Sequence, residues 1–200
     1  MSRSRVGAER RPYHHGDLRN ALIGVALKLL ENEGVADLSL RRLAREAGVS
    51  ATAPYAHFPD RQSVLAAVAE AGFALLDTDL GLAEAAMADQ GPAKQLTALG
   101  AAYVGFAIDH PALFRLMFGS TLADLSAVAS VQEAGRATYA RIDAAVARLR
   151  PEAAAATACW SLLHGLAVLV LDNKLGDDFR ARSELVEGSL AYLIAGLTAA

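Results

Sequence analysis

The stretch at residues 38–61 constrains the fold of this chain most, because it has the pattern of two short helices joined by a tight turn and followed at once by a third. Ser39 is placed to cap the first helix, whose leucines and alanines fall on one face at helical spacing. Gly48 suits the sharp corner that follows, since glycine adopts a positive φ without a Cβ clash. Ser50 and Asp60 are placed to cap the second and third helices. The pattern predicts a helix-turn-helix.

The second of these helices, predicted over residues 51–57, carries mostly small side chains. Small residues let a helix lie deep in the DNA major groove, where hydroxyls reach base edges and methyl groups touch thymine methyls. Pro54 is compatible with this helix because it falls in or just after the first turn, where few amides are yet bonded. Two helices joined through a glycine also occur in many all-α proteins, where they only pack against neighbouring helices. The caps and the small side chains of the second helix favour DNA binding over this alternative.

The side chains of the motif divide into base-reading and phosphate-binding groups. Arg41 is the one long donor that we expect at a base edge, and residues 50–55 complete the contacts to bases and thymine methyls. Ser39, His57 and Arg61 are assigned to phosphate oxygens. The predicted DNA-binding residues are therefore Ser39, Arg41, Ser50, Thr52, Ala53, Tyr55, His57 and Arg61.

A family resemblance rests on these residues and on two motifs outside them. Residues 38–61, with Tyr-x-His-Phe at 55–58 and a basic residue three positions later, resemble the DNA-binding domain of the TetR family of one-component repressors. Residues 13–34 match that family's first helix, and Trp-x-x-x-His-Gly at 160–165 is similar to the signature of one of its subgroups. The resemblance implies a C-terminal domain that binds a small molecule and forms a homodimer.

Charge is distributed unevenly along the 200 residues. Residues 1–61 hold ten Lys plus Arg against seven Asp plus Glu, whereas residues 62–200 hold nine against fifteen. The basic end is the one expected to face a polyanion. We therefore expect a loose, disordered N-terminal arm at 1–12, a helix-turn-helix domain of three helices at 13–61, and a C-terminal helical bundle at 62–200 for ligand binding and dimerisation. The fold class is all-α, with about nine helices.

The region after residue 61 is helical in pattern and aromatic toward its centre. Most such stripes are only core, but here they can also line a cavity for a small apolar or aromatic effector. The candidate ligand-binding residues are Tyr103, Phe106, Phe114, Tyr139, Trp160 and His164. His164 and Tyr103 would be the polar anchors, although His164 can equally be a structural residue of its signature.

The last two helices are expected at 153–171 and 183–198, and their pairing with a second copy would form a four-helix bundle that sets two reading heads on one palindromic operator. Leu190 and Leu193 are the predicted contacts of that homodimer. The first of the two segments has nineteen residues without a charge, so a transmembrane helix is an alternative by length. Its alanines and its central Trp160, Ser161 and His164 favour a helix buried between protein helices instead.

Enzymatic chemistry has little support in the sequence. There is no Gly-rich phosphate loop, no nucleophile elbow and no metal-ligand spacing, so we predict no catalytic residue, no metal and no cofactor. The single Cys159 lies in an apolar run and cannot form an intramolecular disulfide, which fits a reducing, cytoplasmic location. We expect a ligand-responsive transcriptional regulator, most simply a repressor. The alternatives are a helical interaction module or a small-molecule enzyme without DNA binding.

Overall fold

The computed structural model describes residues 18–119, 128–176 and 183–198, and all regular structure in these ranges is helical. The α-helices are α1 (Leu18–Glu33), α2 (Leu40–Ala47), α3 (Arg61–Ala86), α4 (Pro92–Asp109), α5 (Pro111–Phe118), α6 (Ala129–Ala147), α7 (Ala153–Leu171) and α9 (Ser183–Thr198). Two short 3₁₀ helices are η1 (Ala53–Ala56) and η2 (Ala88–Gln90). The predicted all-α class is confirmed, and the arm predicted at 1–12 lies outside the described residues.

The caps that the sequence predicted hold the helix ends near the motif. The Ser39 side chain accepts a hydrogen bond from the Arg42 amide at 3.3 Å and begins α2. Gly48 ends α2 at a φ of 69°, the left-handed region that glycine adopts without strain. Asp60 and Ser63 form a capping box at the start of α3, with the Asp60 carboxylate accepting from the Ser63 amide at 2.7 Å. These ends are set by local sequence alone.

The second motif helix differs from the prediction of an α-helix over 51–57. Residues 51 and 52 form a turn, and only Ala53–Ala56 are helical, as a 3₁₀ turn. Pro54 has no amide proton, so it cannot make the α-helical hydrogen bond to the carbonyl four residues earlier. The Ala53 amide bonds to the Ser50 carbonyl, three residues earlier, at 3.0 Å, which is the 3₁₀ pattern. The Ser50 side chain also does not cap this helix, since its hydroxyl lies 3.3 Å from the Thr52 hydroxyl.

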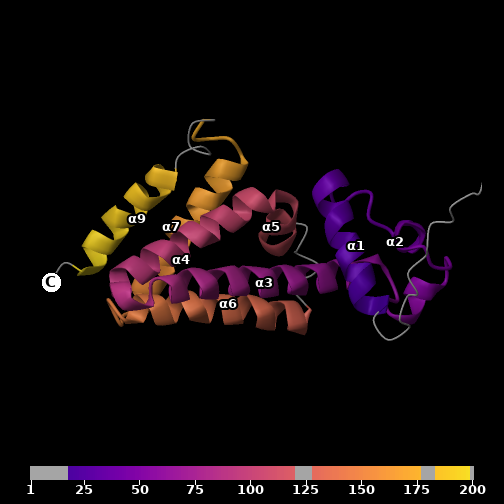
Figure 1. The fold of residues 1–200 in the computed structure, drawn as a ribbon, viewed down its shortest axis with the longest axis horizontal. Helices are drawn as coiled ribbons and strands as arrows, with labels where there is room; N and C mark the ends of the chain where they lie inside the picture. Colours follow the sequence, from indigo (N-terminus) through magenta and orange to yellow (C-terminus); the bar gives the residue numbers. More distant parts are fainter. Residues whose placement is uncertain (1–17, 120–127, 177–182, 199–200) are drawn as a thin grey trace, which may run out of the picture.

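The helices form two groups joined by α3 (Figure 1). α1 and α2 lie at one end of the molecule, and α3 runs from them along the larger group, with α6 beside it. α4 packs on α3 and carries α7 and α9 on its other side, so the C-terminal helix lies far from α1 and α2. The unbroken 26-residue α3 thus connects the two ends.

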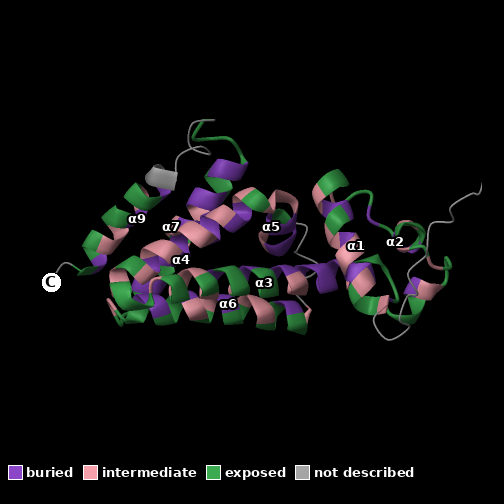
Figure 2. Ribbon diagram, in the orientation of Figure 1, coloured by how far each residue is buried: buried purple, intermediate pink, exposed green. Residues whose placement is uncertain are grey.

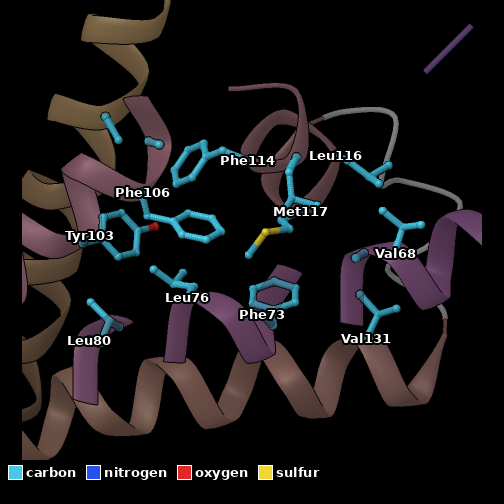
Figure 3. Packing of buried hydrophobic residues seen from close by; sticks show 14 of the residues in the cluster. Val68, Phe73, Leu76, Leu80, Tyr103, Phe106, Phe114, Leu116, Met117 and Val131 are labelled. Atoms are coloured by element: carbon cyan, nitrogen blue, oxygen red, sulfur yellow. The ribbon is translucent and has the colours of Figure 1, made fainter. Parts of the chain in front are cut away.

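The core of the larger group lies where α3, α4, α5 and α6 meet (Figures 2 and 3). Phe73 and Leu76 of α3 face Met117 of α5 in this core. Gly72 lets α5 come this close, because a Cβ there would lie 2.6 Å from Met117 Sδ and 2.9 Å from Leu113 Cδ1. The position of α5 against α3 therefore depends on a glycine.

Ala153–Leu171 is, among the described residues, the one helix long and apolar enough to cross a membrane. In the structure it packs on α4 and α6 as part of the bundle. Its buried residues include Cys159, and burial raises the pKa of that thiol to about 11. Cys159 is thus a small protonated core side chain at neutral pH.

Candidate DNA-binding and effector sites

The three arginines of α2 are used differently. Arg42 Nη2 lies 2.6 Å from Glu33 of α1 and its Nε 3.0 Å from Glu46. Arg45 also pairs with Glu46, at 3.3 Å. Arg41 is exposed and makes no ion pair or side-chain hydrogen bond with the residues that the structure describes. Its guanidinium is the one in α2 left available for a ligand, and its contact with a base edge stays a prediction.

The remaining predicted DNA contacts lie on and around η1. Ser50, Thr52, Tyr55 and His57 are exposed, with Tyr55 at 51% of its full accessibility, while Pro54 is buried beneath them. Ala53 is half-buried. The polar side chains are therefore presented outward from a rigid support, and their contacts with DNA stay predictions.

Arg61 has a structural use that the sequence did not predict. Its Nε donates to the Leu38 carbonyl at 2.7 Å and its Nη2 to the Val35 carbonyl at 2.5 Å. These bonds fix the loop between α1 and α2 to the first residue of α3. A phosphate contact would have to use the other donors of this guanidinium, which has five N–H groups in all.

An apolar cavity of about 140 Å³ lies between α5 and α7. Its lining residues are Phe114, Arg115, Phe118, Gly119, His164, Val168, Leu171 and Asp172. Phe114 and His164 were predicted ligand residues and line it. Phe118 is one of the aromatic residues that the sequence places toward the centre of this region. The other five were missed, although the sequence held a signal for two of them: His164, Val168 and Leu171 follow one another at i, i+4 and i+7 on one helix face.

The mouth of this cavity carries an ion pair between the two helices. Arg115 Nη1 lies 3.0 Å from Asp172 Oδ1, and Arg115 Nη2 donates to the Leu171 carbonyl at 2.7 Å. The two charges compensate each other at a half-exposed position. The cavity therefore offers an effector apolar walls and no unpaired charge from this pair.

A hydrogen bond joins His164 to Tyr103. The hydroxyl of the buried Tyr103 lies 3.1 Å from His164 Nδ1. Burial raises the pKa of Tyr103 and lowers that of His164, so both are neutral at pH 7. A neutral phenol that donates to Nδ1 leaves the imidazole proton on Nε2.

The other predicted ligand residues lie beside the cavity and do not line it. Trp160 packs against His164 with ring centroids 5.7 Å apart, and Tyr139 lies edge-on to Trp160 at 5.7 Å. Phe106 is buried and packs on His110, with centroids 4.9 Å apart. Tyr103 also packs on the cavity residues Phe114 and Phe118, with ring centroids 5.8 and 6.2 Å apart, so it lies directly behind the lining. No group of three or more potential metal ligands occurs within the described part of the chain.

Comparisons with known proteins agree over both ends of the chain. Residues 22–68 match the family of bacterial regulatory proteins named tetR, and residues 96–193 match the tetracyclin repressor-like C-terminal domain. A comparison with curated proteins finds none that matches.

Several solved structures share the whole fold. A protein with unknown function from Rhodococcus sp. RHA1 is 36% identical, with 95% of this chain and all of that chain covered and a TM-score of 0.80. BioQ from Mycobacterium smegmatis is 25% identical over 90% and 97% of the two chains, with a TM-score of 0.62. SCO4454, a TetR-family transcriptional regulator from Streptomyces coelicolor, is 17% identical over 92% and 97%, with a TM-score of 0.70. With the family matches on both the motif and the bundle, the chain belongs to the TetR family and is a ligand-responsive transcriptional regulator.

Proposed function

We propose that this regulator binds a palindromic operator as a homodimer, through Arg41 and the exposed side chains of η1, and that a small molecule in the α5–α7 cavity releases it. Regulators of this family are generally DNA-binding proteins without enzymatic activity. The observation that carries the proposal is Arg41, the arginine of α2 whose guanidinium is left unpaired among the described residues. A long free donor at the motif is what reading a guanine edge requires.

A matched pair of arginine variants tests the reading of DNA. The operator is first selected from a random duplex pool with the full-length protein, and affinities are then measured for Arg41→Ala and Arg45→Ala. Both remove one charge from the exposed side of α2. We expect Arg41→Ala to cost about 1–3 kcal/mol on the selected duplex and to relax preference at one position per half-site. Arg45→Ala should leave the preference unchanged, and equal relaxation by both variants would refute the assignment.

The proposed dimer uses the outer faces of α7 and α9, with one correction to the residues expected there. Leu190 is fully buried and faces inward, close enough to α4 that a Cβ on Gly100 would lie 2.7 Å from it. An aspartate at this position would disrupt the protomer itself. Tyr192, at 86% exposure, and the exposed Leu169 are better candidates for the interface.

Sedimentation at micromolar concentration tests the dimer. Tyr192→Glu should shift the protein toward monomers, because it places a charge within an apolar interface. Leu82→Glu is the control, since Leu82 is also an exposed apolar residue, at 66%, but lies on α3. A wild-type chain that stays monomeric while binding a palindrome tightly would refute dimer binding.

The cavity favours a small neutral effector that is mostly apolar and carries one hydrogen-bond acceptor. Phe114, Phe118 and Val168 supply apolar walls, and about 140 Å³ is room for one aromatic ring. When the Tyr103 hydroxyl donates to Nδ1, the Nε2–H group of His164 is left for an acceptor. An acceptor on the ligand would satisfy it.

Acetophenone and ethylbenzene are suitable probes, because they share the ring and carbon chain and differ in that a carbonyl replaces a methylene group. In calorimetric titrations acetophenone should bind more tightly by about tenfold. His164→Phe should abolish the difference while ethylbenzene affinity is kept. A preference for ethylbenzene in the wild-type protein would refute the polar anchor.

A further inference from the structure

A carboxylate of the DNA-binding end holds the start of the helix that lines the effector cavity. Glu31 of α1 accepts hydrogen bonds from the amides of Ala112, at 3.2 Å, and Leu113, at 3.1 Å. These amides belong to the first turn of α5, which begins at Pro111. The bonds connect residues more than eighty positions apart and cross from one helix group to the other.

The hydrogen bonds from the two α5 amides to the Glu31 carboxylate are strong ones. The first amides of a helix have no partner within it and lie at the positive end of the helix dipole, so a carboxylate there makes charge-assisted bonds. The side chain of Glu31 is 24% exposed, and His110 Nδ1 lies 3.9 Å from Oε1. Water reaches this junction through a hollow of about 310 Å³ between α1, α3 and α5. The bonds can therefore break and re-form without stranding a buried charge.

α5 is also the helix that an effector would touch. Phe114, Arg115 and Phe118 of α5 line the cavity, and they follow directly after the two amides that Glu31 holds. α5 is a single short helix packed on α3 at Gly72, so a displacement at its cavity side moves its first turn as well. The first turn is where Glu31 binds.

α1 continues the connection to the reading motif. Glu33, two residues beyond Glu31, lies 2.6 Å from Arg42 of α2. One helix thus presents one carboxylate to α5 and another to the helix that carries Arg41. Residues 31 and 33 sit in the last turn of α1, so a shift of that turn reaches α2 directly.

We propose that Glu31 is the positioning residue that couples the effector cavity to the DNA-reading motif, through its bonds to the first turn of α5. The coupling rests on the proposed function, since it needs both DNA binding and an effector on α5. Coupling between two sites is reciprocal, so DNA bound at the motif must also change α5. The proposal can therefore be tested from the DNA side without knowing the effector.

Hydrogen exchange of the full-length protein, with and without the selected operator duplex, gives the test. The measured quantity is the change in the exchange rate of amides 115–118 of α5 when the duplex is added. The two amides that Glu31 itself bonds are not used. In wild-type protein the duplex should change exchange there by about fivefold or more. In Glu31→Ala this change should be lost while protection at residues 38–61 persists.

Two further variants separate coupling from a general loss of structure. Glu31→Gln keeps an acceptor oxygen without the charge and should restore part of the α5 response. Glu133→Ala removes an exposed glutamate whose partner is Arg136 of the same helix, and should respond like wild type. An α5 response equal to wild type in both Glu31 variants would overturn the coupling while leaving DNA binding intact. Absence of protection at 38–61 in the wild-type protein would instead overturn DNA binding itself, and the coupling with it.

Discussion

Replacing Arg61 by alanine should destabilise the fold as well as affect DNA binding. The variant loses the bonds from Nε to the Leu38 carbonyl and from Nη2 to the Val35 carbonyl. A hydrogen bond from a charged donor contributes roughly 1.5–3 kcal/mol when buried. Arg61 is exposed and only the first of its bonds is partly buried, so we expect a loss of about 1–2 kcal/mol for the two together.

Thermal unfolding measures this loss. For a chain of this size it corresponds to a fall in Tm of about 3–6 °C. Arg61→Lys is the informative comparison, because lysine keeps the charge but lacks the rigid fork that holds two carbonyls at once. Its Tm should fall nearly as far as that of the alanine variant, while the salt dependence of its DNA binding should stay that of wild type.

A structural role and a phosphate-binding role of Arg61 predict different combinations of Tm and salt dependence. If the side chain only binds a phosphate, Arg61→Ala should have the Tm of the wild-type protein, and the salt slope of its DNA binding should fall by about one. That pair of results would refute the structural role. A lower Tm in both variants, with a reduced slope in the alanine variant alone, would establish both roles.

Three further predictions concern stability. Asp60→Ala removes the capping box of α3 and should lower the free energy of unfolding by about 1 kcal/mol, so an unchanged urea midpoint would contradict the cap. Gly100→Ala should cost about 1–3 kcal/mol, because its Cβ would lie 2.7 Å from Leu190 Cδ1 and 2.9 Å from Leu163 Cδ2. Gly105→Ala on the same helix meets nothing within 4 Å and is its control, so an equal or higher Tm for Gly100→Ala would refute the close packing. Hydrogen bonds from Arg141 hold the pKa of Asp77 below its ordinary value, so this pair stabilises the fold above about pH 4 and its contribution is lost as the pH falls through the lower folded pKa. Asp77→Asn should therefore lower stability at pH 7 and flatten its acid dependence, as followed by urea midpoints from pH 7 to 2.

The sequence predicted best those features that depend on neighbouring residues. The cap at Ser39, the positive φ at Gly48 and the cap at Asp60 were all confirmed, because each rests on a side chain and a backbone group within four positions. The bounds of α7 and α9 agree with the predicted 153–171 and 183–198, and those of α7 coincide with the uncharged run between Glu152 and Asp172. The shortening of η1 was missed because Pro54 removes one helical hydrogen bond, and sequence reasoning judged that loss to be tolerable.

The features that the sequence did not predict depend on distant segments. Arg61 was assigned to phosphate because its type and place suited an anion, and nothing local indicated the carbonyls 23 and 26 positions away. Leu190 was placed at the dimer surface because one helix has two faces that periodicity alone does not distinguish. The cavity lies between α5 and α7, so finding it required knowing which aromatic face of each helix the fold brings together.

α3 is one of two connections between the two ends of the molecule that the described residues show. α1 packs on it, and Arg61 holds the loop between α1 and α2 to its first residue. The contact of Glu31 with α5 supplies a second attachment on the other side of Gly72, so the orientation of the motif depends on where α5 lies relative to α3. In the proposed homodimer two reading heads must match half-sites about 34 Å apart, and a small change of orientation in each protomer alters that spacing. An effector then needs to bind only the arrangement in which α5 is displaced, and its differential affinity for that arrangement sets the limit on release.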